Sequence, residues 1–242
     1  RFDVAFVGDG FIELDYNSPF NTAQSLPPTG LTGARICVRP HATLGRVFDK
    51  DLFTATANPA TADQVLFYAN GAYSACFLLK WGGSVSKPNQ WALMGDGSLG
   101  VQDGRVIAPG EGLLLKSSGA AKRVVTSGYI RTNAFAVSLQ TGNNLLALPW
   151  PLSASPSKAH FTLADGFTGT GNQATADRIH RWSGGGFESF WLVNSGPSLH
   201  FWVSGTGGSL ADLDESEFLP VGESFFLKVQ ASSNHLWAMP RP

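Results

Sequence analysis

Two stretches of the sequence decide how the chain is organised: LFTATANPATADQV at Leu52–Val65 and GFTGTGNQATADRI at Gly166–Ile179. They are identical at eight of fourteen positions without a gap, and they lie 114 residues apart. A match of this quality indicates an internal repeat. Divided between two copies, a chain of 242 residues gives each copy the usual size of a domain.

The match continues along the chain with small changes in spacing. Trp91 corresponds to Trp202 at a separation of 111 residues, and the run Gly110–Lys116 corresponds to Gly222–Lys228 at a separation of 112. These changes fall between apolar runs, where loops tolerate insertions and deletions. We therefore expect two tandem homologous modules, called the first and the second copy below. Their expected boundaries are residues 1–121 and 122–242.

Short runs rich in Val, Phe, Tyr, Trp, Thr and Leu recur between clusters of Gly, Pro, Asn and Ser, and they predict strands. Asn70-Gly71 lies between two such runs, with Gly184-Gly185-Gly186 at the equivalent place, so a tight hairpin is expected at both. No run keeps the apolar period of about 3.6 residues that marks a helix. The predicted fold class is all-β, with two sandwich-like or barrel-like modules and little helix. Strands of the first copy are expected at Phe2–Val7, Phe11–Leu14, Ala34–Arg39, Gln64–Tyr68, Ala72–Leu79, Gln90–Leu93, Arg105–Ile107, Gly112–Lys116 and Lys122–Thr126.

The composition excludes some classes of partner. Charged residues make up 14% of the chain and the formal net charge is −1, so no basic footprint for nucleic acid or for an anionic membrane surface is present. No apolar run approaches the roughly 20 residues that span a bilayer. The surface must be rich in Ser, Thr, Asn and the 28 Gly, a composition typical of exported proteins. We expect an extracellular or cell-surface protein, processed or trimmed before Arg1.

Three short motifs carry a resemblance to a known group of proteins. They are Ala62-Asp63-Gln64-Val65, Pro109-Gly110-Glu111-Gly112 and Asn144-Leu145-Leu146-Ala147-Leu148-Pro149. In this order, with the Asn-Gly hairpin and the Trp-containing strand, the chain resembles uncharacterised secreted β-rich proteins of Verrucomicrobia and Planctomycetes bacteria. The resemblance implies export, and it implies no activity and no catalytic residues.

Two pairs of carboxylates occupy repeated positions, Asp63 with Asp177 and Glu111 with Glu223. A glycosidase would need an acid and a base about 5–10 Å apart, and nothing in the sequence sets such a distance. An Asp just before a strand can instead accept backbone N–H bonds in a turn. Duplication of both pairs favours a structural need that each copy shares, and we expect a protein that is not an enzyme.

Metal and cofactor sites lack their usual patterns. The five His are scattered and the chain has no Cys cluster, so zinc is not expected. An acidic stretch of the second copy could offer several oxygens to calcium. It lacks the spacing of an EF-hand and has no counterpart in the first copy. The alternative to a calcium site is a solvated acidic loop. No cofactor is expected. The weak calcium candidates are Asp212, Asp214, Glu215 and Glu217, and the scattered His are His41, His160, His180, His200 and His235.

Tryptophan offers a second kind of site. Trp91 and Trp202 are equivalent and therefore predicted to be structural, since most Trp in β modules is core. Trp81, Trp182 and Trp191 have no Trp counterpart in the other copy. An exposed row of these three side chains would form a platform for stacking sugar rings.

The two cysteines, Cys37 and Cys76, both lie in the first copy. The second copy has neither, as expected for residues that matter only as a pair. We predict a disulfide between them, which is stable in an exported protein. Closing a loop of about forty residues would stabilise the fold by roughly 3–4 kcal/mol.

One strand pattern occurs three times, at Val4–Val7, at Arg123–Thr126 and at His235–Ala238. Two modules need two closing strands, so Phe2–Val7 is a spare that could pair with a neighbouring chain, because an unpaired strand edge is a template for another strand. The residues expected to form this assembly strand are Phe2, Val4 and Phe6. The alternative is a hairpin with Phe11–Leu14 in the same chain.

These observations favour a non-enzymatic structural or adhesive surface protein, with itself as partner in a head-to-tail polymer or filament. The alternative is a carbohydrate-binding module that contacts glycans through exposed Trp side chains.

Overall fold

The computed structural model describes residues 3–7, 9, 12–15, 40–81, 88–122, 124, 135–196, 199–205, 211–231 and 235–239. The chain divides into two compact units, Arg1–Ala42 and Thr43–Pro242. The predicted strand Ala34–Arg39 and most of Lys122–Thr126 lie outside the described residues.

The first unit contains a β-hairpin of two strands, β1 (Asp3–Val7) and β2 (Ile12–Asp15). They pair antiparallel from Asp3 opposite Asp15 to Val7 opposite Ile12, with an irregularity between Val4 and Phe6. The strand predicted for assembly therefore pairs with its own chain, which is the alternative that the sequence left open. Pairing of this strand with a second chain stays a proposal.

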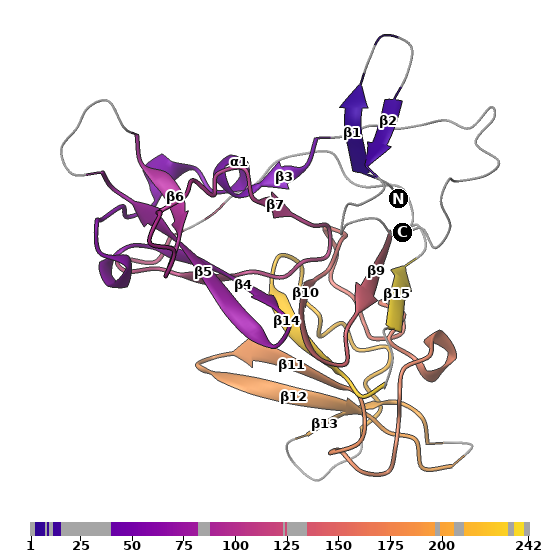
Figure 1. Cartoon of the computed structure of the whole chain (residues 1–242). Coiled ribbons are helices and arrows are strands. Elements are labelled where there is room, and N and C mark those ends of the chain that lie inside the picture. Colours follow the sequence, from indigo (N-terminus) through magenta and orange to yellow (C-terminus); the bar gives the residue numbers. More distant parts are fainter. Residues whose placement is uncertain are drawn as a thin grey trace. The chain divides into compact units, whose positions relative to one another are not determined.

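The second unit is built on two antiparallel sheets, which we call sheet 1 and sheet 2 (Figure 1). Sheet 1 has the order β6-β5-β4-β8, and sheet 2 has the order β13-β12-β11-β14-β10. Sheet 1 consists of β4 (Gln64–Ala69), β5 (Ala72–Leu79), β6 (Gln90–Leu93) and β8 (Leu114–Lys116). Sheet 2 consists of β10 (Gly142–Ala147), β11 (Arg178–Ser183), β12 (Gly186–Leu192), β13 (Trp202–Ser204) and β14 (Ser224–Val229).

The strand order of the two sheets follows the sequence repeat. The strands β4, β5, β6 and β8 correspond to β11, β12, β13 and β14, and they are paired in the same sequence of neighbours. Sheet 2 has β10 beyond β14 as an additional described strand. The unit Thr43–Pro242 contains both sheets, and the division into separate modules at residue 121 stays a prediction.

The remaining elements are short. Helix among the described residues is confined to four pieces of three or four residues, so the all-β fold class is confirmed, and none of these helices is long and apolar enough to cross a membrane. The strands β9 and β15 pair with each other antiparallel. The other elements are β3 (Ala42–Thr43), α1 (Leu44–Val47), β7 (Val106–Ile107), β9 (Phe135–Leu139), β15 (His235–Met239) and the 3-10 turns Lys50–Leu52, Pro59–Thr61 and Leu163–Asp165.

Both predicted hairpins are confirmed. Asn70 and Gly71 join β4 to β5 with φ of 52° and 79°, and Gly184 and Gly185 join β11 to β12 with φ of 58° and 109°. Positive φ at both central residues is the geometry that twists two-residue turns to match a hairpin. Asn and Gly adopt this geometry with little strain.

Each sheet covers its own apolar core. Leu44, Phe48, Phe53 and Trp91 pack against β4 and β5 in the first copy. The larger cluster under sheet 2 includes residues from β9, β10 and β15 as well. Its fully buried large side chains include Leu139, Phe161, Ile179, Leu192, Trp202, Phe225 and Trp237.

Candidate binding surface

The repeated aspartates hold backbone in place. Asp63 is fully buried, and its carboxylate accepts the N–H of Thr54 at 2.8 Å and the N–H of Ser118 at 2.7 Å. Asp177 accepts the N–H of Thr168 at 2.7 Å and the N–H of Gln230 at 2.6 Å, which are the equivalent positions of the second copy. Both aspartates thus accept backbone N–H groups as predicted, but the donors lie 9 residues away and 55 or 53 residues away and not within one turn. The two segments that revealed the repeat have matching environments.

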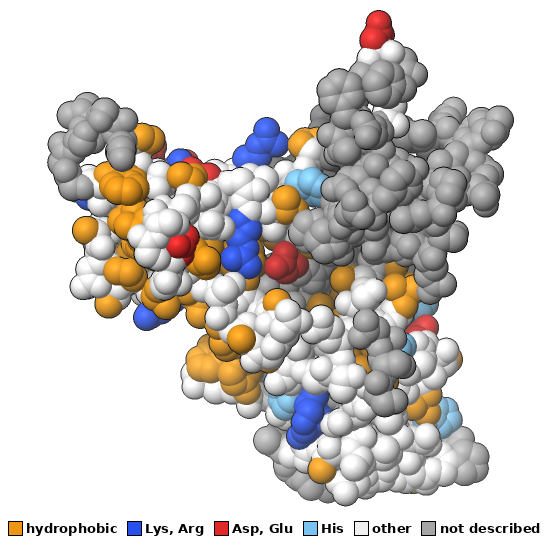
Figure 2. All heavy atoms as spheres, viewed as in Figure 1, with side chains coloured by type: hydrophobic (Ala, Val, Ile, Leu, Met, Phe, Trp, Pro, Cys, Tyr) orange, Lys and Arg blue, Asp and Glu red, His pale blue; other side chains and the backbone are white. Residues whose placement is uncertain are grey.

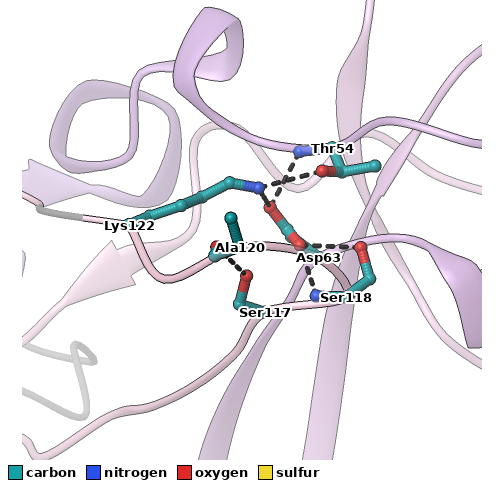
Figure 3. A network of polar contacts seen from close by, with 6 residues as sticks. All are labelled: Thr54, Asp63, Ser117, Ser118, Ala120 and Lys122. Carbon is teal, nitrogen blue, oxygen red and sulfur yellow. Dashed lines mark hydrogen bonds and ion pairs between the residues drawn. The ribbon is translucent and has the colours of Figure 1, made fainter.

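The two aspartates differ in their countercharge. Lys122 Nζ forms an ion pair with Asp63 and also donates to the Thr54 hydroxyl (Figure 3). Burial acts to raise the pKa of Asp63, but the hydrogen bonds from Lys122, Ser118 and Thr54 outweigh it and lower this pKa to about 2. Asp177 has two backbone hydrogen bonds and the more distant His235, so burial dominates and raises its pKa. The sequence motif did not reveal Lys122 as a partner because it lies 59 residues from Asp63.

A second pair of aspartates caps the outer edge of each sheet. Asp103 Oδ1 accepts the N–H of Trp91 at 2.9 Å, and Asp214 Oδ1 accepts the N–H of Trp202 at 2.7 Å. The residue before Asp103 also pairs with this strand, since the N–H of Gln102 donates to the Trp91 carbonyl. Such a covered edge no longer offers a row of free N–H and C=O groups to another chain. Assembly through β6 or β13 is therefore disfavoured.

The acidic stretch of the second copy makes contacts within the protein. Asp214 holds Trp202 as described, and Asp212 accepts the N–H of Asp214. Glu215 accepts the Ser157 hydroxyl, and Glu217 pairs with Lys158 at 2.5 Å. Within the described part of the chain, no three or more His, Cys, Asp or Glu side chains gather where they could hold a metal ion.

Glu111 and the histidines also have local partners. Glu111 Oε2 accepts the N–H of Ala108 at 2.8 Å within the turn before β8, and burial raises its pKa. His160 contacts Asp165 at 3.0 Å and His180 contacts the Ser189 hydroxyl at 2.7 Å. Burial and the positive charges of Arg178 and Lys228 lower the pKa of His180, which keeps it neutral at physiological pH.

Cys76 lies on β5, is fully buried and is bonded to no cysteine among the described residues. Burial raises its pKa, although Arg105 Nη1 lies 3.8 Å from its sulfur. Cys37 lies outside the described residues. The predicted Cys37–Cys76 disulfide is therefore not shown and stays a prediction.

The tryptophans separate into buried and exposed sets. Trp91 and Trp202 are both fully buried, which confirms their structural role. Of the three proposed glycan contacts, Trp182 is 55% exposed, whereas Trp81 and Trp191 are half-buried. Trp81 packs against the buried cluster around Phe77 in sheet 1. Trp81 thus has different surroundings from Trp182 and Trp191, which lie on one face of sheet 2 because Trp182 is opposite Phe187 and alternate residues of β12 share a face.

The structure gathers a different set of aromatic side chains, which we call the aromatic surface cluster. Trp182 contacts Phe187 with ring centroids 5.1 Å apart, and Phe187 contacts Phe226 at 6.0 Å. Phe226 also contacts Tyr68 at 5.3 Å and Tyr73 at 6.4 Å. Phe187 and Tyr73 are 53% and 49% exposed. In Figure 2 hydrophobic side chains gather at the end of the β11–β12 hairpin seen in Figure 1.

The cluster is built from equivalent residues of the two copies. Tyr68 and Tyr73 face each other across β4 and β5, and Trp182 and Phe187 face each other across β11 and β12, at the separation of 114 residues. Each pair adjoins a hairpin turn. Matched Trp residues do not reveal this equivalence, because the counterpart of Trp182 is a tyrosine, Tyr68. The sequence signal that could have predicted the cluster is an aromatic residue at both equivalent positions, whether or not the two residues are identical.

Backbone contacts join the two copies beside this cluster. The N–H of Gly112 donates to the Leu145 carbonyl at 3.0 Å, and the N–H of Ala147 donates to the Gly110 carbonyl at 2.9 Å. Ser224 Oγ accepts the Leu113 N–H and donates to the Leu113 carbonyl. The segment before β8 thus lies along the edge of β10 and extends sheet 2.

Gly112 allows this close approach, and we expect Gly112→Ala to destabilise the protein. A Cβ at this position would lie 2.6 Å from the carbonyl oxygen of Leu146 and 2.8 Å from its nitrogen. Crowding of this kind costs about 1–3 kcal/mol. Urea unfolding would measure it, with Gly104→Ala as the matched control, since a Cβ there meets nothing within 4 Å. Equal midpoints for the two variants would contradict the close packing of the copies.

Comparisons with known proteins found no matching family model, no matching curated protein and no matching solved structure. The resemblance to secreted bacterial β-rich proteins stays an expectation from the sequence motifs.

Proposed function

We propose that this chain is a non-enzymatic structural or adhesive protein of the cell surface or the extracellular space, and that it acts by associating with further copies of itself. The observation that carries the proposal is the packing of its own two copies, which meet through aromatic side chains around Phe226 and through backbone pairing at Gly112. A unit that binds a copy of itself within one chain has the surface chemistry to do so between chains.

Other features support the same reading. The carboxylates of the repeat, Asp63, Asp177, Asp103 and Asp214, accept backbone N–H groups and serve the fold. Tyr73, Trp182 and Phe187 of the aromatic surface cluster are exposed, and large exposed apolar patches mark sites of interaction. The low charge of the chain offers little repulsion against close packing. The Ser-rich, Thr-rich and Gly-rich composition supports a place outside the cell.

The proposal predicts self-association that depends on protein concentration. Sedimentation velocity over a range of concentrations should show species larger than the monomer, and negative-stain microscopy of concentrated protein should show extended oligomers. The result that would overturn the proposal is a single monomeric species at every concentration.

Carbohydrate binding is the second candidate, and the exposed indole of Trp182 favours it. A sugar ring stacks on an exposed aromatic face. Titration with soluble oligosaccharides of glucose, xylose and N-acetylglucosamine, followed by tryptophan fluorescence, tests this candidate. Trp182→Phe is the matched variant, since it retains an aromatic ring but removes the indole signal. A flat titration with all three sugars would count against glycan binding.

A further inference from the structure

One face of sheet 2 carries two neighbouring cations. Lys228 on β14 lies directly opposite Arg178 on β11. The residues next to them, Leu227 and Ile179, are buried in the core, so both cations lie on the other face of the sheet, since successive residues of a strand alternate between faces. Both cationic side chains are half-buried. Like charges directly opposite each other destabilise a sheet, unless an anion neutralises them.

No carboxylate of the second unit neutralises this pair. Every Asp and Glu after residue 43 is among the described residues, and none of them forms an ion pair with Arg178 or Lys228. The Nε of Arg178 is buried and has no hydrogen-bond partner among the described residues. Buried polar groups are nearly always hydrogen-bonded. This unpartnered guanidinium nitrogen thus indicates a position for an external acceptor.

Both cations also act on a histidine of the same face. His180 lies two residues after Arg178 on β11, so the two side chains share a face. Burial, and then the charges of Arg178 and Lys228, lower the pKa of His180. Its Nδ1 lies 2.7 Å from the Ser189 hydroxyl. The face therefore has a positive potential beside neutral polar groups.

Aromatic side chains adjoin the cations on this face. Trp191 on β12 lies directly opposite Arg178, and Trp182 on β11 lies directly opposite Phe187 on β12. Trp182 and Phe187 are exposed. They lie four residues along their strands from the row of Arg178 and Trp191, about 13 Å away. One face of sheet 2 thus combines a cation pair with an exposed aromatic platform.

The first copy shows that the fold does not require this arginine. Gln64 corresponds to Arg178, and Phe77 corresponds to Trp191, at the separation of 114 residues. Gln64 is buried, and its Nε2 donates to the Pro59 carbonyl at 2.7 Å. The equivalent position of the first copy is therefore satisfied within the chain. The cation pair beside a tryptophan is a property of the second copy alone.

We propose that this face of sheet 2 binds an acidic saccharide, with a carboxylate or sulfate group between Arg178 and Lys228 and with sugar rings on the aromatic side chains of β11 and β12. A guanidinium group suits such anions because its N–H groups donate paired hydrogen bonds. The inference rests on the second candidate function, carbohydrate binding, and names the class of saccharide. It does not depend on self-association.

Titration calorimetry with oligogalacturonate and with its methyl ester tests the role of charge, because the ester keeps the sugar rings but has no carboxylate. The acid should bind at least tenfold more tightly than the ester, and its affinity should fall as salt is added. A sulfated oligosaccharide of galactose, titrated in the same way, distinguishes a site for sulfate esters from one for carboxylates. Inorganic sulfate alone should bind far more weakly than either oligosaccharide.

Two variants test the cations separately. Arg178→Gln introduces the residue that the first copy carries, and Lys228→Met removes the second charge. Each should weaken binding of the acidic saccharide roughly tenfold or more, because it removes a charged hydrogen-bond donor, and should leave binding of the ester unchanged. The control is Lys158→Gln, which removes an exposed cation paired with Glu217 and should bind like the unchanged protein.

Thermal unfolding checks that each variant is folded, and Arg178→Gln should not lower the melting temperature, because it removes a repulsion. Equal affinity for the acid and its ester would overturn the inference while carbohydrate binding stands. Absence of binding to both acidic oligosaccharides, or equally tight binding of inorganic sulfate alone, would also overturn it. None of these outcomes bears on self-association, which sedimentation measures separately.

Discussion

Asp63→Asn should lower the free energy of unfolding by about 3 kcal/mol near neutral pH, because breaking a buried ion pair leaves the partner charge uncompensated. The asparagine also replaces one acceptor oxygen with an NH2 group that faces the donors Thr54, Ser118 and Lys122. Urea unfolding of the variant measures this loss. A double-mutant cycle with Lys122→Met isolates the part that belongs to the ion pair.

The effect of Asp63→Asn should shrink in acid. The pKa of Asp63 is lowered from the ordinary aspartate value of 3.8 to about 2 in the folded protein, so the folded state binds this proton less tightly than the unfolded state. The stability that the carboxylate contributes is present above about pH 4 and is lost as the pH falls toward 2. The difference between the unchanged protein and the variant should fall by about 2 kcal/mol over that range.

Asp177→Asn is the matched control with the opposite sign. Burial raises the pKa of Asp177, so its contribution to stability is present below the unfolded pKa and is lost as the pH rises through the folded value. The cost of Asp177→Asn should therefore be smaller than that of Asp63→Asn at neutral pH and should grow in acid. Parallel pH dependences for the two variants would contradict the assigned role of Lys122.

Trp202→Ala should destabilise the protein by about 3–5 kcal/mol, the usual cost of removing a large buried aromatic side chain. Trp202 is fully buried, and its indole N–H donates to the Phe161 carbonyl. The same substitution at Trp91, whose indole donates to the Phe48 carbonyl, should cost a similar amount. Chemical unfolding monitored by circular dichroism would give both values.

Trp182→Ala is the control for the tryptophan series. Its side chain is 55% exposed, so the loss should stay within about 1 kcal/mol. A loss as large as that of Trp202→Ala would show that Trp182 belongs to the core and would remove the basis for a binding role. The series thus separates structural from surface tryptophan by a single measurement.

Local sequence patterns predicted the parts of the fold that depend on neighbouring residues. The turn at Asn70-Gly71 needs positive φ, which few residues adopt without strain. These two residues were therefore sufficient to predict the hairpin. The aspartates before β4 and β11 accept N–H groups nine residues earlier in the chain, within the repeated segment itself. The burial of Trp91 and Trp202 followed from their equivalence.

Long-range contacts were outside the reach of those patterns. Nothing near Phe226 in the sequence indicates Tyr68 or Tyr73, more than 150 residues away. The cluster depends on how two sheets pack, and many side chains are compatible with a surface of this kind. The choice of Trp81, Trp182 and Trp191 as candidate glycan contacts did not reveal the cluster for this reason, since side-chain identity says little about which strand ends meet.

The sequence by itself determined that the chain carries an internal repeat, that it folds as an all-β protein and where its tight hairpins lie, because repeats, strand alternation and turn residues are local properties of the chain. Tertiary structure alone decided that Lys122 neutralises Asp63, that the segment before β8 extends the sheet of the second copy, and that equivalent aromatic pairs meet around Phe226. These features depend on contacts between segments that are far apart in the sequence. Local sequence patterns do not indicate which distant segments come together in the folded protein.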